Sequence, residues 1–416
     1  MQKDLKVAYM LLHFPFLTET FVAEEIRALR AQGTEVQVLS LLSPGRGPIQ
    51  PLSESLLPYT HYGPSLASGR LWSANVGEFL RHPVLYLALF WRLLTCPCPS
   101  RPLALLGKRV VIFWKAVAIA AQLRGQGVDL IHAHFAWLPA AGAWVAARLL
   151  GVPFTVTIHA YDIFTSTDLL PLIMREAAQV VAISEYNRQY VHERGLRDAT
   201  EIVVIHCGID PEQFAAESNS AAPSPVDRPL QILSVGSLNE KKGHGFLIEA
   251  CALLAQRDIE FECRIIGSGS GRDRLEQQIR AAGLEGRVEL LGAKPSPEIA
   301  AAYREHDLFV LASVVADNGD RDGIPVVMME AGAAGLPLVS TRVSGIPELV
   351  QHEKTGLLTP PESPVALADA MTTLAHDPAL RHSLGRGASR LVLAEFDVEK
   401  NAARLRTCFS EVVSRK

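Results

Sequence analysis

The chain has 416 residues, which is too long for one ordinary hydrophobic core, so we expect two domains of similar size. A hydrophobic content of 48% with 20% charged residues excludes a disordered chain, and a net charge of −4 excludes a global attraction to nucleic acid. The six cysteines are scattered along the chain, which favours reduced thiols in the cytoplasm over a disulfide scaffold.

The first predicted elements are a strand, a helix and a second strand, at residues 6–12, 21–31 and 35–42. Basic residues before an apolar run also fit a secretion signal. However, Asp4 precedes the run, Pro15 follows it, and the sequence has no small-residue cleavage site there. No charge-free apolar run reaches the ~18 residues that a membrane-spanning helix needs.

Residues 71–124 do not alternate between strand and helix. They combine aromatic and aliphatic residues with basic ones, and Glu78 is their only acidic residue. Basic amphipathic segments of this kind can lie in an anionic membrane interface. A pair of core helices with solvated basic faces explains the pattern equally well.

Further apolar strands predict a parallel sheet that is covered on both faces. They lie at residues 129–133, 154–158, 180–183 and 202–205, with a helix at 140–150. Residues 215–229 change to Ala, Ser and Pro, which cannot bury enough surface to hold regular structure. We take this segment as a linker between a first domain, 1–214, and a second domain, 230–397.

The second half repeats the alternation and predicts another doubly wound unit. Its strands are expected at residues 231–235, 261–266, 288–291, 308–312 and 337–340, and its helices at 244–256, 272–282, 297–306 and 326–334.

The stretch from Asp322 to Glu330 carries the clearest chemistry. Pro325 suits the first turn of a helix, which leaves Gly323 and Ile324 in a loop that a ligand can approach closely. A helix start attracts negative charge, whereas the two carboxylates accept hydrogen bonds from sugar hydroxyls. A ligand with an anionic middle and two hydroxylated ends fits, which describes a nucleotide-diphosphate sugar. A surface salt bridge is the alternative for Glu330.

Two glycine-containing loops also follow strands. Lys241-Lys242-Gly243 is a reasonable phosphate loop, and a solvated turn is the alternative. Gly267 opens a Gly-Ser-Gly-Ser-Gly stretch, which we interpret as the loop near the nucleotide base.

In the first half, His159 ends a strand and opens a loop with Tyr161 and Asp162, where parallel sheets form ligand crevices. His132 and His134 flank the end of another strand. No acidic residue lies at metal-ligand spacing from them, so a zinc site is disfavoured.

Thr18, Glu19 and Thr20 lead into the first helix and predict a helix cap that faces the cleft. A cap alone would explain them.

These stretches resemble the retaining GT-B glycosyltransferases of family 4, whose C-terminal signature has two acidic residues separated by seven. Asp322 stands where that family usually has Glu. The resemblance covers nearly the whole chain and is greatest with the branch that builds bacterial exopolysaccharides. It runs through residues 14–21, 131–135, 159–162, 235–243 and 266–269.

The resemblance implies a role for each site residue. Glu330 would hold the ribose hydroxyls and Asp322 those of the donor sugar, while backbone of Gly323, Ile324 and Pro325 would face the sugar and diphosphate. Lys242 would pair with the phosphates, and His159 would contact the donor sugar. The family commonly has arginine where this chain has Ser237. Lys241 or Arg321 would then supply the second positive charge, or the donor would be held less tightly.

The resemblance also implies two Rossmann-like domains across a cleft, with a final helix at about 398–413 that packs back onto the first domain. The acceptor side would include Thr18, Glu19, Thr20, His134, Tyr161 and Asp162.

We expect retaining transfer from a nucleotide sugar to a saccharide or polyprenyl-linked acceptor, without a metal or other cofactor and with no nucleic acid partner. The protein would be cytoplasmic, at the inner face of the membrane. The alternatives are a non-catalytic sugar-nucleotide-binding or scaffold protein and a GT-B sugar-nucleotide epimerase.

Overall fold

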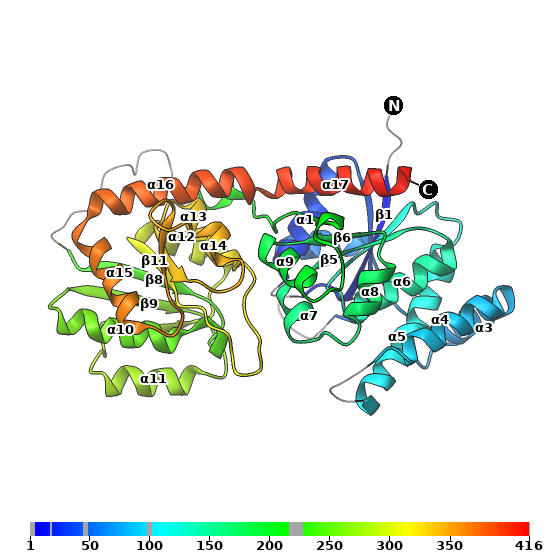
Figure 1. Cartoon of the computed structure of the whole chain (residues 1–416), viewed down its shortest axis with the longest axis horizontal. Coiled ribbons are helices and arrows are strands. Elements are labelled where there is room, and N and C mark those ends of the chain that lie inside the picture. The colour runs from blue at the N-terminus through cyan, green and yellow to red at the C-terminus, as the bar shows by residue number, and fades with distance from the viewer. Residues whose placement is uncertain (1–4, 17–18, 45–48, 98–101, 216–227, 416) are drawn as a thin grey trace. The chain divides into compact units, whose positions relative to one another are not determined.

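The computed structural model describes residues 5–16, 19–44, 49–97, 102–215 and 228–415. The chain forms two compact units (Figure 1). The first comprises Met1–Cys207 with Val398–Lys416, and the second comprises Gly208–Asp397. Each unit contains one parallel sheet with helices, which confirms the predicted α/β class.

The first unit has a seven-stranded sheet in the order β3-β2-β1-β4-β5-β6-β7, and every neighbouring pair is parallel. Most of these short apolar strands are buried along their length, as expected for a sheet covered on both faces. The strands are β1 (Lys6–His13), β2 (Glu35–Leu42), β3 (Thr60–Tyr62), β4 (Leu130–His134), β5 (Phe154–Ile158), β6 (Gln179–Ala182) and β7 (Ile202–Val204).

Helices cover this sheet on two sides, each with its own core. One core holds Trp144 and Phe113, and the other holds Tyr9 and Phe409. The helices are α1 (Thr20–Ala31), α2 (Pro51–Ser55), α3 (Gly69–Arg81), α4 (Pro83–Leu94), α5 (Pro102–Leu123), α6 (Leu138–Leu150), α7 (Ala160–Phe164), α8 (Leu170–Glu176), α9 (Glu185–Glu193) and α17 (Val398–Ser414), with short 3₁₀ turns η1 (Leu57–Tyr59) and η2 (Ala199–Glu201).

The non-alternating segment forms α3, α4 and α5. Helix α5 packs into the core, and two of its basic side chains point inward rather than to solvent. Lys115 donates to the Leu41 carbonyl at 2.9 Å, and Arg109 donates to the Cys96 carbonyl at 2.6 Å. The expected solvated basic faces are therefore wrong for these two residues, because each charge is used to satisfy a backbone carbonyl.

The second unit has a six-stranded sheet in the order β10-β9-β8-β11-β12-β13, again parallel throughout. Its strands are β8 (Leu230–Val235), β9 (Phe261–Ile266), β10 (Val288–Gly292), β11 (Leu308–Leu311), β12 (Leu338–Thr341) and β13 (Gly356–Thr359). Its helices are η3 (Pro211–Gln213), η4 (Glu240–Lys242), α10 (His244–Gln256), α11 (Arg272–Ala281), α12 (Ser296–Glu305), α13 (Val326–Ala333), α14 (Ile346–Leu349), α15 (Pro364–His376) and α16 (Pro378–Glu395).

The boundary between the units lies at Cys207/Gly208, earlier than the expected linker. Residues just after it already belong to the second unit: the Ile209 amide donates to the Phe396 carbonyl at 2.9 Å, and Phe214 packs edge-on against Tyr303. Most of the expected linker, residues 216–227, lies outside the described residues.

Candidate functional site

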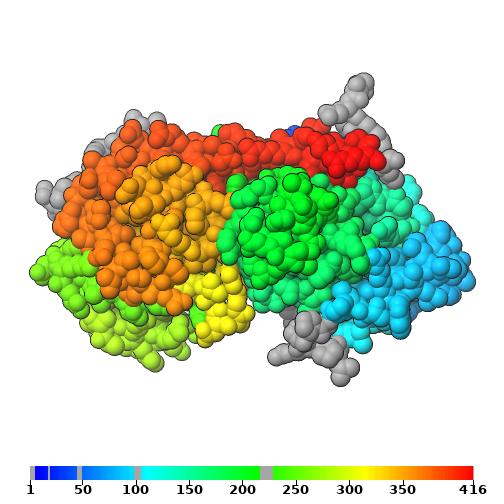
Figure 2. All heavy atoms as spheres, viewed as in Figure 1, coloured from blue at the N-terminus to red at the C-terminus, as the bar shows by residue number. Residues whose placement is uncertain are grey.

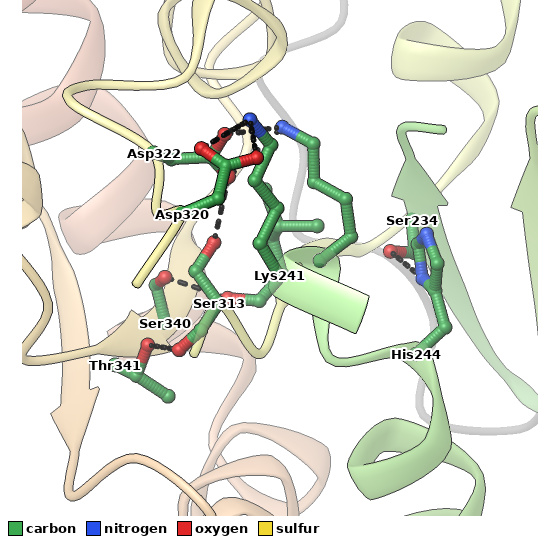
Figure 3. A network of polar contacts seen from close by, with 10 residues as sticks. Ser234, Lys241, His244, Ser313, Asp320, Asp322, Ser340 and Thr341 are labelled. Carbon is green, nitrogen blue, oxygen red and sulfur yellow. Dashed lines mark hydrogen bonds and ion pairs between the residues drawn. The ribbon is translucent and has the colours of Figure 1, made fainter. Parts of the chain in front are cut away.

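The centre of the second-unit site is an ion pair between Lys242 and Asp322. Figure 3 shows Asp322 with the neighbouring Lys241 and Asp320. Lys242 ends η4, in the loop after β8, and Asp322 lies in the loop between β11 and α13. The lysine Nζ atom lies 3.0 Å and 2.9 Å from the two carboxylate oxygens, and the Ser313 hydroxyl donates to the same carboxylate at 3.2 Å. The fold thus brings two predicted site residues into direct contact at the carboxyl ends of parallel strands.

A second pair lies beside the first. Lys241 Nζ lies 3.0 Å from an Asp320 oxygen and 3.9 Å from Asp322. The Val314 amide donates to the Lys241 carbonyl at 2.9 Å, which ties the loop after β8 to the loop after β11. Two lysines and two aspartates therefore form one cluster whose charges balance.

Two glycines allow these loops to approach each other. Gly243 has φ +63°, and a Cβ atom there would lie 1.8 Å from the Ala312 carbonyl oxygen. A Cβ atom at Gly267 would lie 1.8 Å from the Gly236 carbonyl oxygen. No side chain fits at either position, so the glycines are needed for the close packing of the loops after β8, β9 and β11.

Glu330 lies on α13 and accepts a hydrogen bond from the Tyr303 hydroxyl at 2.8 Å. Burial raises the pKa of Glu330 to about 7, although the Tyr303 bond acts in the opposite direction. Pro325 is the residue before the helix, with φ −65° and ψ 128°, rather than part of its first turn. Ile324 is buried and Gly323 is half-buried, so less of this loop is exposed to a ligand than the sequence suggests.

The position where the family commonly has arginine, Ser237, is exposed. Of the two candidates for a second positive charge, Lys241 pairs with Asp320, and Arg321 donates from Nε to the Gly319 carbonyl at 3.2 Å. Sequence reasoning missed His244, the first residue of α10, which lies next to Ser234 in Figure 3. Burial and the charge of Lys242 lower its pKa to about 4, so it is neutral at physiological pH.

In the first unit, the predicted residues His134 and His159 are joined by a buried hydrogen-bond chain. His134 Nδ1 lies 3.0 Å from His159 Nε2, and His134 Nε2 lies 3.0 Å from a Glu25 oxygen. The Tyr9 hydroxyl donates to the same Glu25 oxygen at 2.6 Å. Burial, with the neighbouring His134, holds the pKa of His159 well below its usual range, so His159 is neutral.

Glu25 is the acidic residue that the sequence spacing did not place near the histidines. Glu25, His132 and His134 offer ligand atoms within 4.8 Å of one another. Each already has hydrogen-bond partners: His132 uses both ring nitrogens, at 2.8 Å from the Thr155 hydroxyl and 3.2 Å from the Thr157 hydroxyl. The contacts thus account for these side chains as a hydrogen-bonded network.

Asp162 has a different position from the one expected. It is fully buried and accepts hydrogen bonds from the backbone amides of Ala136 and His159, and the second bond makes it part of the capping box of α7, whose N-cap is His159. Burial raises its pKa to about 7. Both oxygens already accept hydrogen bonds inside the fold, and the acceptor contact predicted for this side chain stays a prediction. Tyr161 is exposed and lies edge-on to Trp137.

The N-cap of the first helix falls among the three predicted residues, but its side chain does not cap the helix. Glu19 occupies the N-cap position of α1 but makes no capping hydrogen bond with its side chain, and Thr20 is the first helical residue. Burial raises the pKa of Glu19 to about 7. Thr18 lies outside the described residues.

His159 belongs to the first unit, whereas Lys242, Asp322 and Glu330 belong to the second. The cleft shared by the two units stays a prediction.

Comparison with known proteins covers both units. A model described as "Glycosyltransferase Family 4" matches residues 18–213, and "Glycosyl transferases group 1" matches residues 216–391. The "Putative colanic acid biosynthesis glycosyltransferase WcaL" of Salmonella typhimurium is 33% identical over 383 residues, covering 88% of this chain and 89% of that protein. The chain belongs to the family 4 glycosyltransferases. The amylovoran biosynthesis glycosyltransferase AmsK of Erwinia amylovora is 44% identical to this family member over 181 residues, 44% of each chain.

Solved structures agree on the fold. Sucrose-phosphate synthase from Thermosynechococcus elongatus superposes with a TM-score of 0.74 at 21% identity, covering 99% of this glycosyltransferase and 100% of that chain. HepE of Anabaena, in complex with UDP, gives 0.71 at 18% identity, covering 98% and 100%. The family 4 glycosyltransferase described here therefore has the GT-B fold, as predicted.

Proposed function

We propose that this glycosyltransferase moves a sugar, with retention of configuration, from a nucleotide-diphosphate donor to a saccharide or polyprenyl-linked saccharide in exopolysaccharide synthesis. The relatives named for colanic acid and amylovoran biosynthesis support this polymer class. Structures of the similar HepE protein contain UDP and UDP-glucose, which supports the donor class. We place the reaction in the cytoplasm, at the inner face of the membrane.

The observation that carries the proposal is the Lys242–Asp322 pair, whose aspartate lies in the loop just before the N-terminus of α13. An ammonium group beside a helix start suits a diphosphate, and a carboxylate next to it suits sugar hydroxyls. In the proposed complex Lys242 exchanges Asp322 for phosphate oxygens, Asp322 accepts from the sugar, and Glu330 accepts from the ribose. Lys241 or Arg321 supplies the second positive charge that Ser237 lacks.

The proposed reaction is a same-face substitution. The bond between the anomeric carbon and the diphosphate oxygen breaks while the acceptor oxygen forms its bond on the same face. The acceptor proton passes to the departing diphosphate. Lys242 and the backbone amides at the start of α13 stabilise the charge that develops on the leaving group, so no metal is needed.

The first unit contributes His159 to the donor sugar in this proposal. Because its ring is buried and hydrogen-bonded to His134, the imidazole is held in one orientation. Tyr161 is the exposed candidate for acceptor contact.

A panel of nucleotide sugars tests the proposal. The correct donor should raise the melting temperature, since saturation at 100 times the dissociation constant adds roughly 2.7 kcal/mol. NMR of the product should then show the anomeric configuration of the donor. An inverted product would overturn retention, an epimerised donor would indicate an epimerase, and binding without turnover of any donor would indicate a non-catalytic protein.

A further inference from the structure

Helix α3 presents an apolar stripe to solvent. Trp72, Val76, Phe79 and Leu80 are exposed and recur at the spacing of one helix face. The opposite face, with Leu71, packs inward against α5. An amphipathic helix of a globular protein normally buries its single apolar stripe, so a second stripe that faces outward requires another explanation.

Helix α4 continues the same surface. Val84, Leu87 and Trp91 recur at intervals of three and four residues, and Val84 and Trp91 are 81% and 69% exposed. Leu89 and Leu93 on the other side are buried. In Figure 1, α3 and α4 lie side by side at the edge of the first unit, where they project from its sheet together with α5. In Figure 2 this end of the first unit is drawn in light blue, and nothing covers it in the view shown.

We call the seven exposed apolar residues of these two helices the α3–α4 surface; they are Trp72, Val76, Phe79, Leu80, Val84, Leu87 and Trp91. The charges around it are basic. Arg70 and Arg81 are exposed, and Glu78 is the only acidic residue from 69 to 97. Glu78 is buried, where it pairs with Arg81 and Arg124 at 2.7 Å and 2.6 Å, so its carboxylate does not reach this surface.

We propose that the α3–α4 surface inserts into the interface of an anionic phospholipid membrane. Its aliphatic and aromatic side chains would enter the boundary between headgroups and acyl chains, where tryptophan is favoured, and the exposed Arg70 would meet lipid phosphates. No helix among the described residues is long and apolar enough to cross a membrane, so this contact is interfacial.

The charge pattern favours a membrane over a second copy of the chain. A twofold-symmetric contact places the same patch on both partners, so the basic residues of one copy would face those of the other. Anionic lipid headgroups carry the opposite charge. The inference deepens the proposed function, because a polyprenyl-linked acceptor is met at such a surface, but its test does not depend on sugar transfer.

Sedimentation of the full chain with vesicles tests the inference. The protein should bind vesicles that contain phosphatidylglycerol and bind far less to pure phosphatidylcholine vesicles, with a blue shift of tryptophan fluorescence on binding. Val76→Glu should weaken binding to the anionic vesicles by about tenfold or more, because it places a carboxylate in the apolar surface. Val365→Glu is the matched control, since both valines lie on helices and are 57% exposed.

Equal binding by the two variants, or no binding of the unchanged protein, would overturn the inference. A change from dimer to monomer in Val76→Glu, with vesicle binding unaltered, would assign the surface to a second copy instead. Transfer to a soluble acceptor should be the same in both variants. If no donor reacts in any of them while vesicles still bind, the proposed function fails and the membrane surface stands.

Discussion

The ammonium group of Lys242 lies within 3.0 Å of both carboxylate oxygens of Asp322, so the proposed phosphate ligand and the proposed sugar ligand neutralise each other. Both side chains are nearly buried. In the proposed complex the donor must therefore separate this pair when it binds. A change at Asp322 should alter phosphate binding by Lys242, and a change at Lys242 should alter sugar binding by Asp322.

Lys242→Met should weaken binding of a nucleoside diphosphate by about tenfold or more, because a charge-assisted hydrogen bond contributes roughly 1.5–3 kcal/mol. Asp322→Asn should preserve or strengthen the same binding while it lowers turnover of the sugar donor, because it releases Lys242. Titration calorimetry with the nucleoside diphosphate measures both, and Lys294→Met, at an exposed ion pair with Glu298, is the control. Equal losses in the two site variants would contradict the separate roles.

Glu330→Gln should weaken donor binding by roughly 1.5–3 kcal/mol, because the amide replaces a charged acceptor of the ribose hydroxyls. The loss is measured from the shift in melting temperature that the donor causes in the folded variant. Tyr303→Phe is the control for the neighbouring hydroxyl and should change donor affinity less. A folded Glu330→Gln protein with unchanged affinity would remove Glu330 from the site.

The raised pKa of Glu330 predicts a pH dependence of stability. Its value rises from 4.5 to about 7 on folding, so between these pH values the native state keeps a proton that the unfolded state has released. The contribution of Glu330 to stability therefore falls as pH rises through this window. Glu330→Gln removes that loss. The melting temperature of the variant minus that of the unchanged protein should therefore be larger at pH 8 than at pH 5. An equal difference at both pH values would mean that the carboxyl group titrates normally.

Gly243→Ala should destabilise the protein far more than Gly283→Ala. The two glycines have nearly the same φ, +63° and +65°, so both variants incur the cost of left-handed backbone, about 1 kcal/mol. Only at Gly243 must the Ala312 backbone also move, which adds roughly 1–3 kcal/mol. Chemical denaturation measures the difference, and similar losses would show that the loops after β8 and β11 are not tightly packed.

Activity should persist in a strong chelator, because Lys242 and the amides at the start of α13 are proposed to carry the diphosphate. The assay compares initial rates with and without EDTA. A rate that EDTA abolishes and magnesium or manganese restores would require a metal at the site. Recovery with zinc instead would indicate a metal site at Glu25, His132 and His134.

The sequence predicted the elements more fully than their contacts. Alternation of short apolar runs and helices was enough for most of both sheets, but β3 and β13 were missed. Thr60–Tyr62 has only three residues and no apolar run, and Gly356–Thr359 lacks a strong pattern. The Lys242–Asp322 contact joins positions 80 residues apart, and His134 meets Glu25 across 109 residues. Local spacing cannot reveal such pairs. Nor could it separate Asp162 as a helix cap from Asp162 as a ligand, because both roles place a carboxylate after a strand.

Helix α17 has a consequence for how the protein is made. Its residues Leu405, Phe409 and Val412 complete the core that contains Tyr9, yet they leave the ribosome only after the whole second unit. At ordinary translation speeds this takes on the order of tens of seconds. The part of this sheet face that α1 does not cover must stay exposed during that time. The unit that is synthesised first is therefore finished last, and its nascent chain is the part that most needs protection from aggregation.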